Sequence, residues 1–321
     1  MRPAIFLLPW LALSTLTFAQ QELPLGAGET GAIYEKLQQS PLTDDQKQQV
    51  RQAIQARDYK TAEVILVRAI DANQKSAELL TLSAGVFLLD KNPLNTAIAL
   101  KKAERIQPLG AADRFSLAMA YTAMEKRDWA RQELDRLTAA EPGNTLYTYW
   151  LARLDYDDQH FESAVRRLRR VTSVNPAFMK AWDNLGLSLE GMGELDQAVA
   201  SYREAVRQNR DARAPSPWPP LNLGTLLMKM GDLKSAEECL LEAVRFDAKL
   251  AKARYQFGMN LHKQKRDAEA IPELRHAAEL DPSDPEPFYT LGRIYEGQGE
   301  SSASADAFRQ FELLKKKRRV R

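Results

Sequence analysis

The 321-residue sequence is poor in the residues that disulfide, metal and redox sites require. It contains one cysteine, Cys239, and three histidines in all. A framework of intrachain disulfides is therefore excluded, and a zinc site built from cysteine and histidine lacks ligands. A dominant charge is also missing, because 45 basic residues balance 43 acidic ones. Net charge thus points to no class of partner, and the composition is that of an ordinary soluble, folded chain.

Long apolar runs are scarce as well, with one exception at the N-terminus. Arg2 precedes an apolar run from Ala4 to Leu13, and Thr17 and Ala19 place small residues where a signal peptidase reads them. This pattern predicts a signal peptide over residues 1–19 and export to the periplasm or the outside. A membrane anchor needs about 20 consecutive apolar residues, and the serine and threonine content disfavours it. We expect no transmembrane helix in the mature chain.

No catalytic motif in the sequence occurs in the structural context that the motif requires. Residues 26–31 match G-x-G-x-x-G, but no strand precedes them and no βαβ unit follows. His160, His262 and His276 are far apart in the sequence and belong to no H-E-x-x-H motif. Paired carboxylates occur beside arginine and lysine, as is typical of solvated helix faces. The sequence therefore predicts no enzyme activity, no cofactor and no metal.

What the sequence does contain is a repeat of 34 residues. Counted from Thr43, units begin at residues 43, 77, 111, 145 and 179 and, after a four-residue insertion, at 217, 251 and 285. Two positions of the unit are almost always small, because closely crossing helices leave no room for a branched side chain. The eighth position reads Val50, Ala84, Ala118, Ala152, Gly186, Gly224, Gly258 and Gly292. Each unit is predicted to be a pair of helices, and in four units a proline ends the second helix.

With these positions aligned, residues 43–318 resemble the tetratricopeptide repeat (TPR) family. The family's signature is clearest in the fifth and eighth units, which carry Trp182, Leu185, Gly186, Ala198 and Tyr202, and Phe288, Leu291, Gly292, Tyr295 and Phe308. The resemblance implies an all-α fold, a right-handed superhelical solenoid of about eight helix-turn-helix repeats. Repeats 1–5 would span residues 43–212, and repeats 6–8 residues 217–318, with the insertion at 213–216 between them. The first unit departs most from the signature, which is typical of a capping repeat.

Three segments lie outside the regular period. Residues 20–42 contain two prolines and three glycines, so they predict a flexible lead-in with one short helix over 33–39. The joint at 212–220 holds four prolines and is either a tolerated surface insertion or a bend that reshapes the groove and presents Trp218. The basic tail at 315–321 either solubilises the helix end or contacts an anionic envelope surface. Nucleic acid is not an expected partner of an exported chain.

The resemblance also implies a binding surface. In the family the first helix of each repeat lines the concave groove, and positions 2, 5, 6, 9, 12 and 13 face the ligand. Asn184 and Asn222 are predicted to clamp a ligand main chain, whereas about half of the aromatic and methionine side chains are expected to pack against neighbouring repeats. The residues predicted to bind protein or peptide are Tyr149, Trp150, Arg153, Tyr156, Asn184, Leu187, Asn222, Lys252, Tyr255, Gln256 and Met259.

Two hypotheses of function follow. The first is an exported, non-catalytic scaffold or adaptor that binds a protein or peptide in its concave groove. The alternative is a structural assembly factor of an envelope complex, attached through its ends and its basic tail, with the groove filled by residues 20–42. The lysine and asparagine set with which some TPR proteins grip a C-terminal carboxylate is incomplete here, because Asp183 and Leu187 stand where its first pair belongs.

Overall fold

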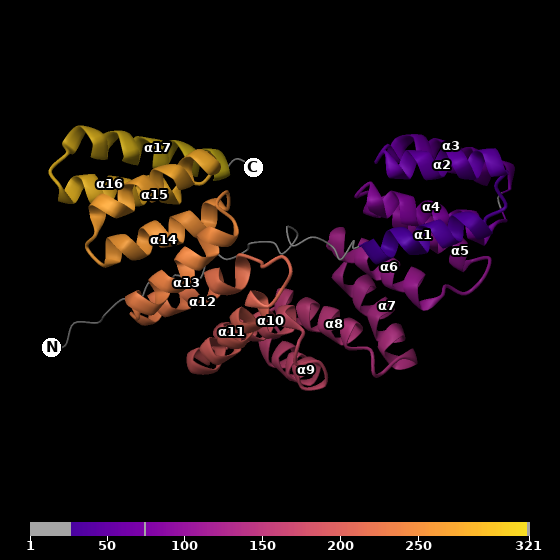
Figure 1. Cartoon of the computed structure of the whole chain (residues 1–321), viewed down its shortest axis with the longest axis horizontal. Coiled ribbons are helices and arrows are strands. Elements are labelled where there is room, and N and C mark those ends of the chain that lie inside the picture. Colours follow the sequence, from indigo (N-terminus) through magenta and orange to yellow (C-terminus); the bar gives the residue numbers. More distant parts are fainter. Residues whose placement is uncertain (1–26, 74, 320–321) are drawn as a thin grey trace. The chain divides into compact units, whose positions relative to one another are not determined.

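The computed structural model describes residues 27–73 and 75–319, and the regular structure in these residues is entirely α-helical (Figure 1). The predicted all-α repeat solenoid is thereby confirmed. The predicted signal peptide lies outside the described residues. None of the described helices is both long enough and apolar enough to cross a lipid bilayer.

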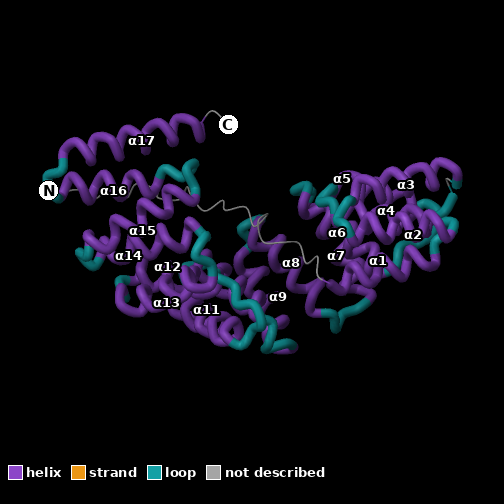
Figure 2. The backbone as a smooth tube through the Cα atoms, turned by 45° about the horizontal axis from the view of Figure 1, so that its top comes forward, coloured by secondary structure: helices purple, strands orange, loops and turns teal. Residues whose placement is uncertain are grey.

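One helix, α1 (Ala27–Gln39), precedes eight pairs of helices. The two helices of a pair pack against each other, as α16 and α17 do in both views (Figures 1 and 2). The pairs are α2 (Asp44–Gln55) with α3 (Tyr59–Ala72), α4 (Ala77–Leu89) with α5 (Pro93–Glu104), α6 (Ala111–Ala123) with α7 (Arg127–Ala140), α8 (Thr145–Asp157) with α9 (Phe161–Val174), α10 (Met179–Gly191) with α11 (Leu195–Arg210), α12 (Trp218–Met230) with α13 (Leu233–Phe246), α14 (Ala251–Lys263) with α15 (Asp267–Leu280), and α16 (Glu286–Gly297) with α17 (Ser301–Arg319).

The chain divides into two compact units, residues 1–143 and 144–321. We call them the N-terminal unit, which contains α1–α7, and the C-terminal unit, which contains α8–α17. The first helix of each pair is called an A helix. In each unit the core forms where an A helix crosses its partner and meets the next pair.

The turn inside each pair has the same backbone geometry in all eight repeats. The fifteenth residue of the unit lies in the left-handed region, with φ between 54° and 91°. Three of these residues are glycines, to which this conformation costs little, and the other five pay about 1–2 kcal/mol each. The residues are Arg57, Lys91, Glu125, Gln159, Gly193, Gly231, Lys265 and Gly299. The repeat therefore imposes this turn even where the local sequence does not favour it.

The small eighth position has the steric role that the sequence predicts. A Cβ atom placed on Gly186 would lie 2.5 Å from Cδ1 of Tyr202, well inside contact distance. Tyr202 belongs to the partner helix α11 and is fully buried, with 0% of its surface exposed. The glycine thus lets a large aromatic ring occupy the crossing point, where a side chain on residue 186 would collide with it.

The described part of the predicted lead-in, residues 27–42, consists mainly of a packed helix, where the sequence predicted a flexible segment with one short helix. Helix α1 spans Ala27–Gln39, longer than the short helix expected over 33–39. Ile33 and Leu37 are 6% and 0% exposed and belong to one core cluster with Val50, Leu66 and other side chains of the first two repeats. The two glycines of α1 suggested flexibility, but burial of apolar side chains outweighs their low helix propensity.

The irregular joint before α12 is held by one buried asparagine. Asn209, fully buried near the end of α11, donates its side-chain amide to the carbonyl of Ser216 at 2.8 Å and accepts from the Ser216 amide at 2.7 Å. Pro219 and Pro220 then lie in the first turn of α12, where a missing N–H costs no helical hydrogen bond. The proline-rich segment ends one helix and starts the next, with defined geometry between them.

Candidate protein-binding surface

The eleven predicted site residues all lie in the C-terminal unit, on four A helices. Successive A helices contact one another in the order α8, α10, α12, α14 and α16. Four predicted residues come from α8, two from α10, one from α12 and four from α14. The A helices therefore form a continuous row, which we call the A-helix face of the C-terminal unit.

Four of the predicted residues are buried within this row. Tyr149, Trp150, Arg153 and Asn184 are 2%, 4%, 8% and 3% exposed. The guanidinium carbon of Arg153 lies 4.5 Å from the centre of the Trp150 ring, a cation–π distance. The Tyr149 ring packs against Phe178, with 4.8 Å between ring centres. These side chains form a layer that supports the surface from below.

Asn184 uses its amide inside the protein. Its Nδ2 donates to the hydroxyl of Tyr149 at 3.1 Å and to the carbonyl of Lys180 at 2.7 Å. Both amide hydrogens are therefore engaged, and the side chain joins α10 to α8. The structure places Asn184 as a buried link between repeats, in a position different from the exposed clamp that the sequence suggested.

The remaining seven predicted residues are half-buried, with part of each side chain in contact with solvent: Tyr156, Leu187, Asn222, Lys252, Tyr255, Gln256 and Met259. Burial raises the pKa of Tyr156 and of Tyr255 to about 12. Burial also lowers the pKa of Lys252, whose ammonium lies 5.8 Å from the centre of the Trp218 ring.

Helix α10 also carries a buried carboxylate, Asp183, at a position that departs from the family pattern. Asp183 is 3% exposed, and both of its carboxylate oxygens accept from Nδ2 of Asn222, at 3.0 and 3.2 Å. Burial raises the pKa of Asp183 to about 6. The available signal was its position, because the fifth position of other repeats in this unit holds Tyr149, Leu221 and Tyr255. A charged residue at an otherwise apolar or aromatic position marks a special environment.

A second polar group links three helices of the same face. Glu190 accepts a hydrogen bond from the hydroxyl of Tyr202 at 3.1 Å and forms an ion pair with Lys229 at 2.7 Å. Glu190 belongs to α10, Tyr202 to α11 and Lys229 to α12. The face thus combines partly exposed aromatic and aliphatic side chains with polar groups held in fixed positions, an arrangement suited to binding another polypeptide.

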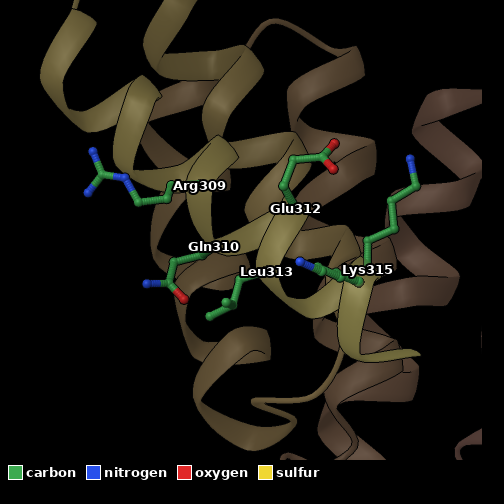
Figure 3. A pocket seen from close by; sticks show the side chains of 6 residues that line it. Arg309, Gln310, Glu312, Leu313 and Lys315 are labelled. Carbon is green, nitrogen blue, oxygen red and sulfur yellow. The ribbon is translucent and has the colours of Figure 1, made fainter. Parts of the chain in front are cut away.

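Other potentially reactive groups lie apart from this face. Among the residues that the structure describes, no cluster of three or more histidine, cysteine or acidic residues could hold a metal ion. Cys239 is half-buried, and burial raises the pKa of its thiol to about 11, so little thiolate exists at neutral pH. A shallow pocket on α17 is lined by Arg309, Gln310, Glu312, Leu313, Lys315 and Lys316 (Figure 3).

Comparison with known proteins agrees with this architecture. The family model described as tetratricopeptide repeat matches residues 151–213 and 221–285. A curated relative, the protein CTR9 homolog of Arabidopsis thaliana, is 23% identical over 250 residues, which cover 64% of this chain. The chain spans about a fifth of the length of that relative, since the match covers 22% of it.

Solved structures of other proteins share the fold. The Cut9–Hcn1 hetero-tetramer of the APC/C contains a chain with a TM-score of 0.62 and 13% identity, over 82% of this chain and 51% of that one. PilW, described as a widely conserved type IV pilus biogenesis factor, has a TM-score of 0.57 and 16% identity, over 63% of this chain and 92% of that one. At these identities the likeness concerns the fold. The chain thus carries tetratricopeptide repeats in residues 151–213 and 221–285, within an all-α repeat solenoid.

Proposed function

We propose that this protein is a non-catalytic, exported scaffold that binds a protein or peptide on the A-helix face of its C-terminal unit. One observation carries the proposal: seven of the predicted residues, from four successive A helices, are partly exposed on one row. Aromatic and aliphatic side chains gathered in this way are costly to leave in water, and together with amide groups they are typical of interaction surfaces.

The chemistry of the face favours a polypeptide in extended form. Asn222 holds its amide toward Asp183, which orients its Oδ1 as an acceptor for a ligand N–H. Gln256 offers both a donor and an acceptor, and Tyr255 and Met259 offer apolar surface beside it. Alternating apolar contacts with hydrogen bonds to the main chain is a general way to bind a peptide.

Export remains part of this proposal. It rests on the charged, apolar and small-residue pattern of residues 1–19. The fold likeness to PilW, a pilus biogenesis factor, is compatible with a place in the cell envelope. Fractionation of the native host tests it: we expect the protein in the envelope fraction with an N-terminus at Gln20, and an intact Met1 in the cytoplasm would exclude export.

A second candidate function is an assembly factor of an envelope complex, attached through its ends. The packing of α1 against A helices of the N-terminal unit favours it, because that part of the repeat array is already occupied. Its attachment point would be the basic end of α17, where Lys315–Arg318 are exposed. Anionic vesicles would then retain the full-length protein and release a variant that lacks residues 315–321.

The decisive experiment is site-specific photo-crosslinking in the native envelope. A photo-reactive p-benzoylphenylalanine replaces Leu187 on the A-helix face, and a matched control replaces Glu238, an exposed residue of α13. We expect one specific protein to be captured at position 187, with capture lost when Tyr255→Ala and Gln256→Ala are added. Equal capture at both positions would contradict the proposed surface and favour attachment through the ends.

A further inference from the structure

Helix α1 lies on the same face of the repeats that forms the candidate surface in the C-terminal unit. It packs against the A helices α2 and α4, and Lys36 forms an ion pair with Asp113 of the third A helix, α6. Ile33 lies directly over Gly85, the ninth residue of its repeat. In the C-terminal unit the ninth position holds Leu187 and Met259, two residues of the candidate surface. By repeat register, α1 occupies a ligand position.

The face is shaped to receive this helix. A Cβ atom on Gly85 would lie 2.9 Å from Cγ1 and 3.3 Å from Cδ1 of Ile33, so a larger residue there would force the Ile33 side chain out of its present position. One turn further along α1, Leu37 is fully buried among apolar side chains of the first two repeats. At the helix end, Lys47 donates to the carbonyl of Gln38 at 2.9 Å, and the Arg51 guanidinium lies 5.8 Å from the Tyr34 ring centre. The fit combines an apolar slot with a polar rim.

Helix α1 itself is a poor helix without the face. It has 13 residues, and two of them, Gly28 and Gly31, weaken a helix relative to alanine. No atom lies within 4 Å of a Cβ placed on Gly31, so packing does not demand a glycine there. A helix of this length and composition is marginal alone in water. Its folding therefore depends on docking, as for a peptide that folds on binding.

We propose that the A-helix face of the N-terminal unit is a receptor for a short amphipathic helix, and that α1 is a tethered ligand which a partner helix of the same pattern displaces. The pattern is the one that α1 presents: apolar residues at i and i+4, as Ile33 and Leu37, with a lysine at i+3, as Lys36, to meet Asp113. This receptor is separate from the ligand surface proposed for the C-terminal unit, and the two are tested independently.

The test measures binding of a fluorescent peptide, residues 27–42 of this chain, to the full-length protein by anisotropy. Tethering makes α1 a strong competitor in the wild type, because a short linker gives an effective concentration near millimolar. Ile33→Asp removes the apolar contact of the tethered helix and opens the face. We expect this variant to bind the peptide at least about tenfold more tightly than the wild type does. A modest loss in the free energy with which the tethered helix docks is enough to raise the apparent affinity for the peptide by a factor of ten.

Two matched variants sharpen the result. Gly31→Ala strengthens α1 without a clash, so we expect peptide binding about two- to fivefold weaker than in the wild type. Gly85→Ala added to Ile33→Asp blocks the slot for the peptide's own isoleucine, so the tight binding should disappear. Equal peptide affinity in the wild type and in a folded Ile33→Asp variant would overturn the proposal.

Hydrogen exchange on the unmodified protein gives an independent readout if Ile33→Asp does not fold. A displaceable α1 opens alone, so amides of residues 33–39 should exchange at least about tenfold faster than those buried in α4. Gly31→Ala should slow exchange in α1 and leave α4 unchanged. Exchange of α1 and α4 at one common rate would mean that α1 opens only when the unit unfolds, and the proposal would be wrong.

Discussion

The two units are built from the same repeat, but they differ in whether their A-helix face is covered. Helix α1 packs on this face in the N-terminal unit, whereas side chains of the face are partly exposed in the C-terminal unit. In the N-terminal unit the ninth position of the second repeat is Gly85, and helix α1 covers it. In the C-terminal unit the ninth position carries Arg153, Leu187, Thr225, Met259 and Arg293, and all of these except Arg153 are partly or fully exposed. At Gly85 the ninth position leaves room for Ile33 of α1, whereas at the equivalent positions of the C-terminal unit a side chain is present.

The units also differ in what lies beneath that face. Apolar side chains such as Val50, Leu66 and Leu82 underlie α1 in the N-terminal unit. In the C-terminal unit the buried layer includes Asp183 and Asn184, which hydrogen-bond to other A helices. Buried polar groups are costly unless they are satisfied, and when satisfied they fix neighbouring helices in register. We interpret this as a covered apolar face in the N-terminal unit and an open face of defined geometry in the C-terminal unit, and four predictions test the difference.

The largest effect is expected at a crossing point of the C-terminal unit. Tyr202→Ala leaves a void over Gly186, and we expect a loss of about 3–5 kcal/mol in the free energy of unfolding. Tyr202→Phe keeps the ring and removes one hydrogen bond to Glu190, so it should cost about 0.5–1.5 kcal/mol. Urea unfolding measures both values, and a loss below about 1 kcal/mol for Tyr202→Ala would contradict the packing described for this repeat.

A pair of leucine truncations compares the two faces directly. Leu37→Ala removes a fully buried side chain of α1 and should cost about 2–5 kcal/mol. Leu187→Ala removes a half-exposed side chain from the open face and should cost about 1 kcal/mol or less. Urea titrations of both variants give the comparison. Equal losses would show that the face of the C-terminal unit is no more open than the face that α1 covers.

The buried carboxylate predicts a pH dependence in the C-terminal unit. Burial raises the pKa of Asp183 from its ordinary 3.8 to about 6, so the native chain holds this proton more tightly than the unfolded chain. The resulting stability is present below about pH 4 and is lost as pH rises through about 6, by on the order of 2–3 kcal/mol.

Asp183→Asn removes this titration and keeps an acceptor for Asn222. Between about pH 4 and pH 7 the wild type should therefore lose on the order of 2–3 kcal/mol more stability than the variant. Chemical unfolding of both proteins at the two pH values isolates the contribution of Asp183, because the two proteins differ only at this residue. A difference between the two proteins that stays constant with pH would argue against a raised pKa for Asp183.

The smallest effects are expected from two ion pairs on the two faces. Lys36 and Asp113 have side chains that are 28% and 18% exposed, whereas Lys229 and Glu190 are 60% and 25% exposed. Lys36→Ala should cost about 1 kcal/mol and Lys229→Ala about half of that or less, because water screens the more exposed pair. Raising the salt concentration should reduce the difference between the urea midpoints of the two variants. A larger loss of stability for Lys229→Ala than for Lys36→Ala would contradict the difference in burial between the two ion pairs.

Much of the fold was accessible from local pattern. A 34-residue period with small residues at two fixed positions predicts paired helices, because close crossing tolerates little volume at Gly186 and its equivalents. The scarcity of cysteine and histidine argued in the same direct way against a disulfide framework and a zinc site. These properties depend on residue size and spacing within one repeat, which is why inspection of the chain alone suffices.

Which side chains reach solvent depended on neighbours that the sequence does not place. Asn184 is engaged by a tyrosine 35 residues away, and the carboxylate of Asp183 by an asparagine 39 residues away. Helix α1 read as a flexible segment, because it lies outside the period and contains glycine, yet docking on α4 orders it. Burial is a property of the assembled repeats: the energy that orders α1 and buries Asp183 comes from surfaces which meet only after the chain has folded.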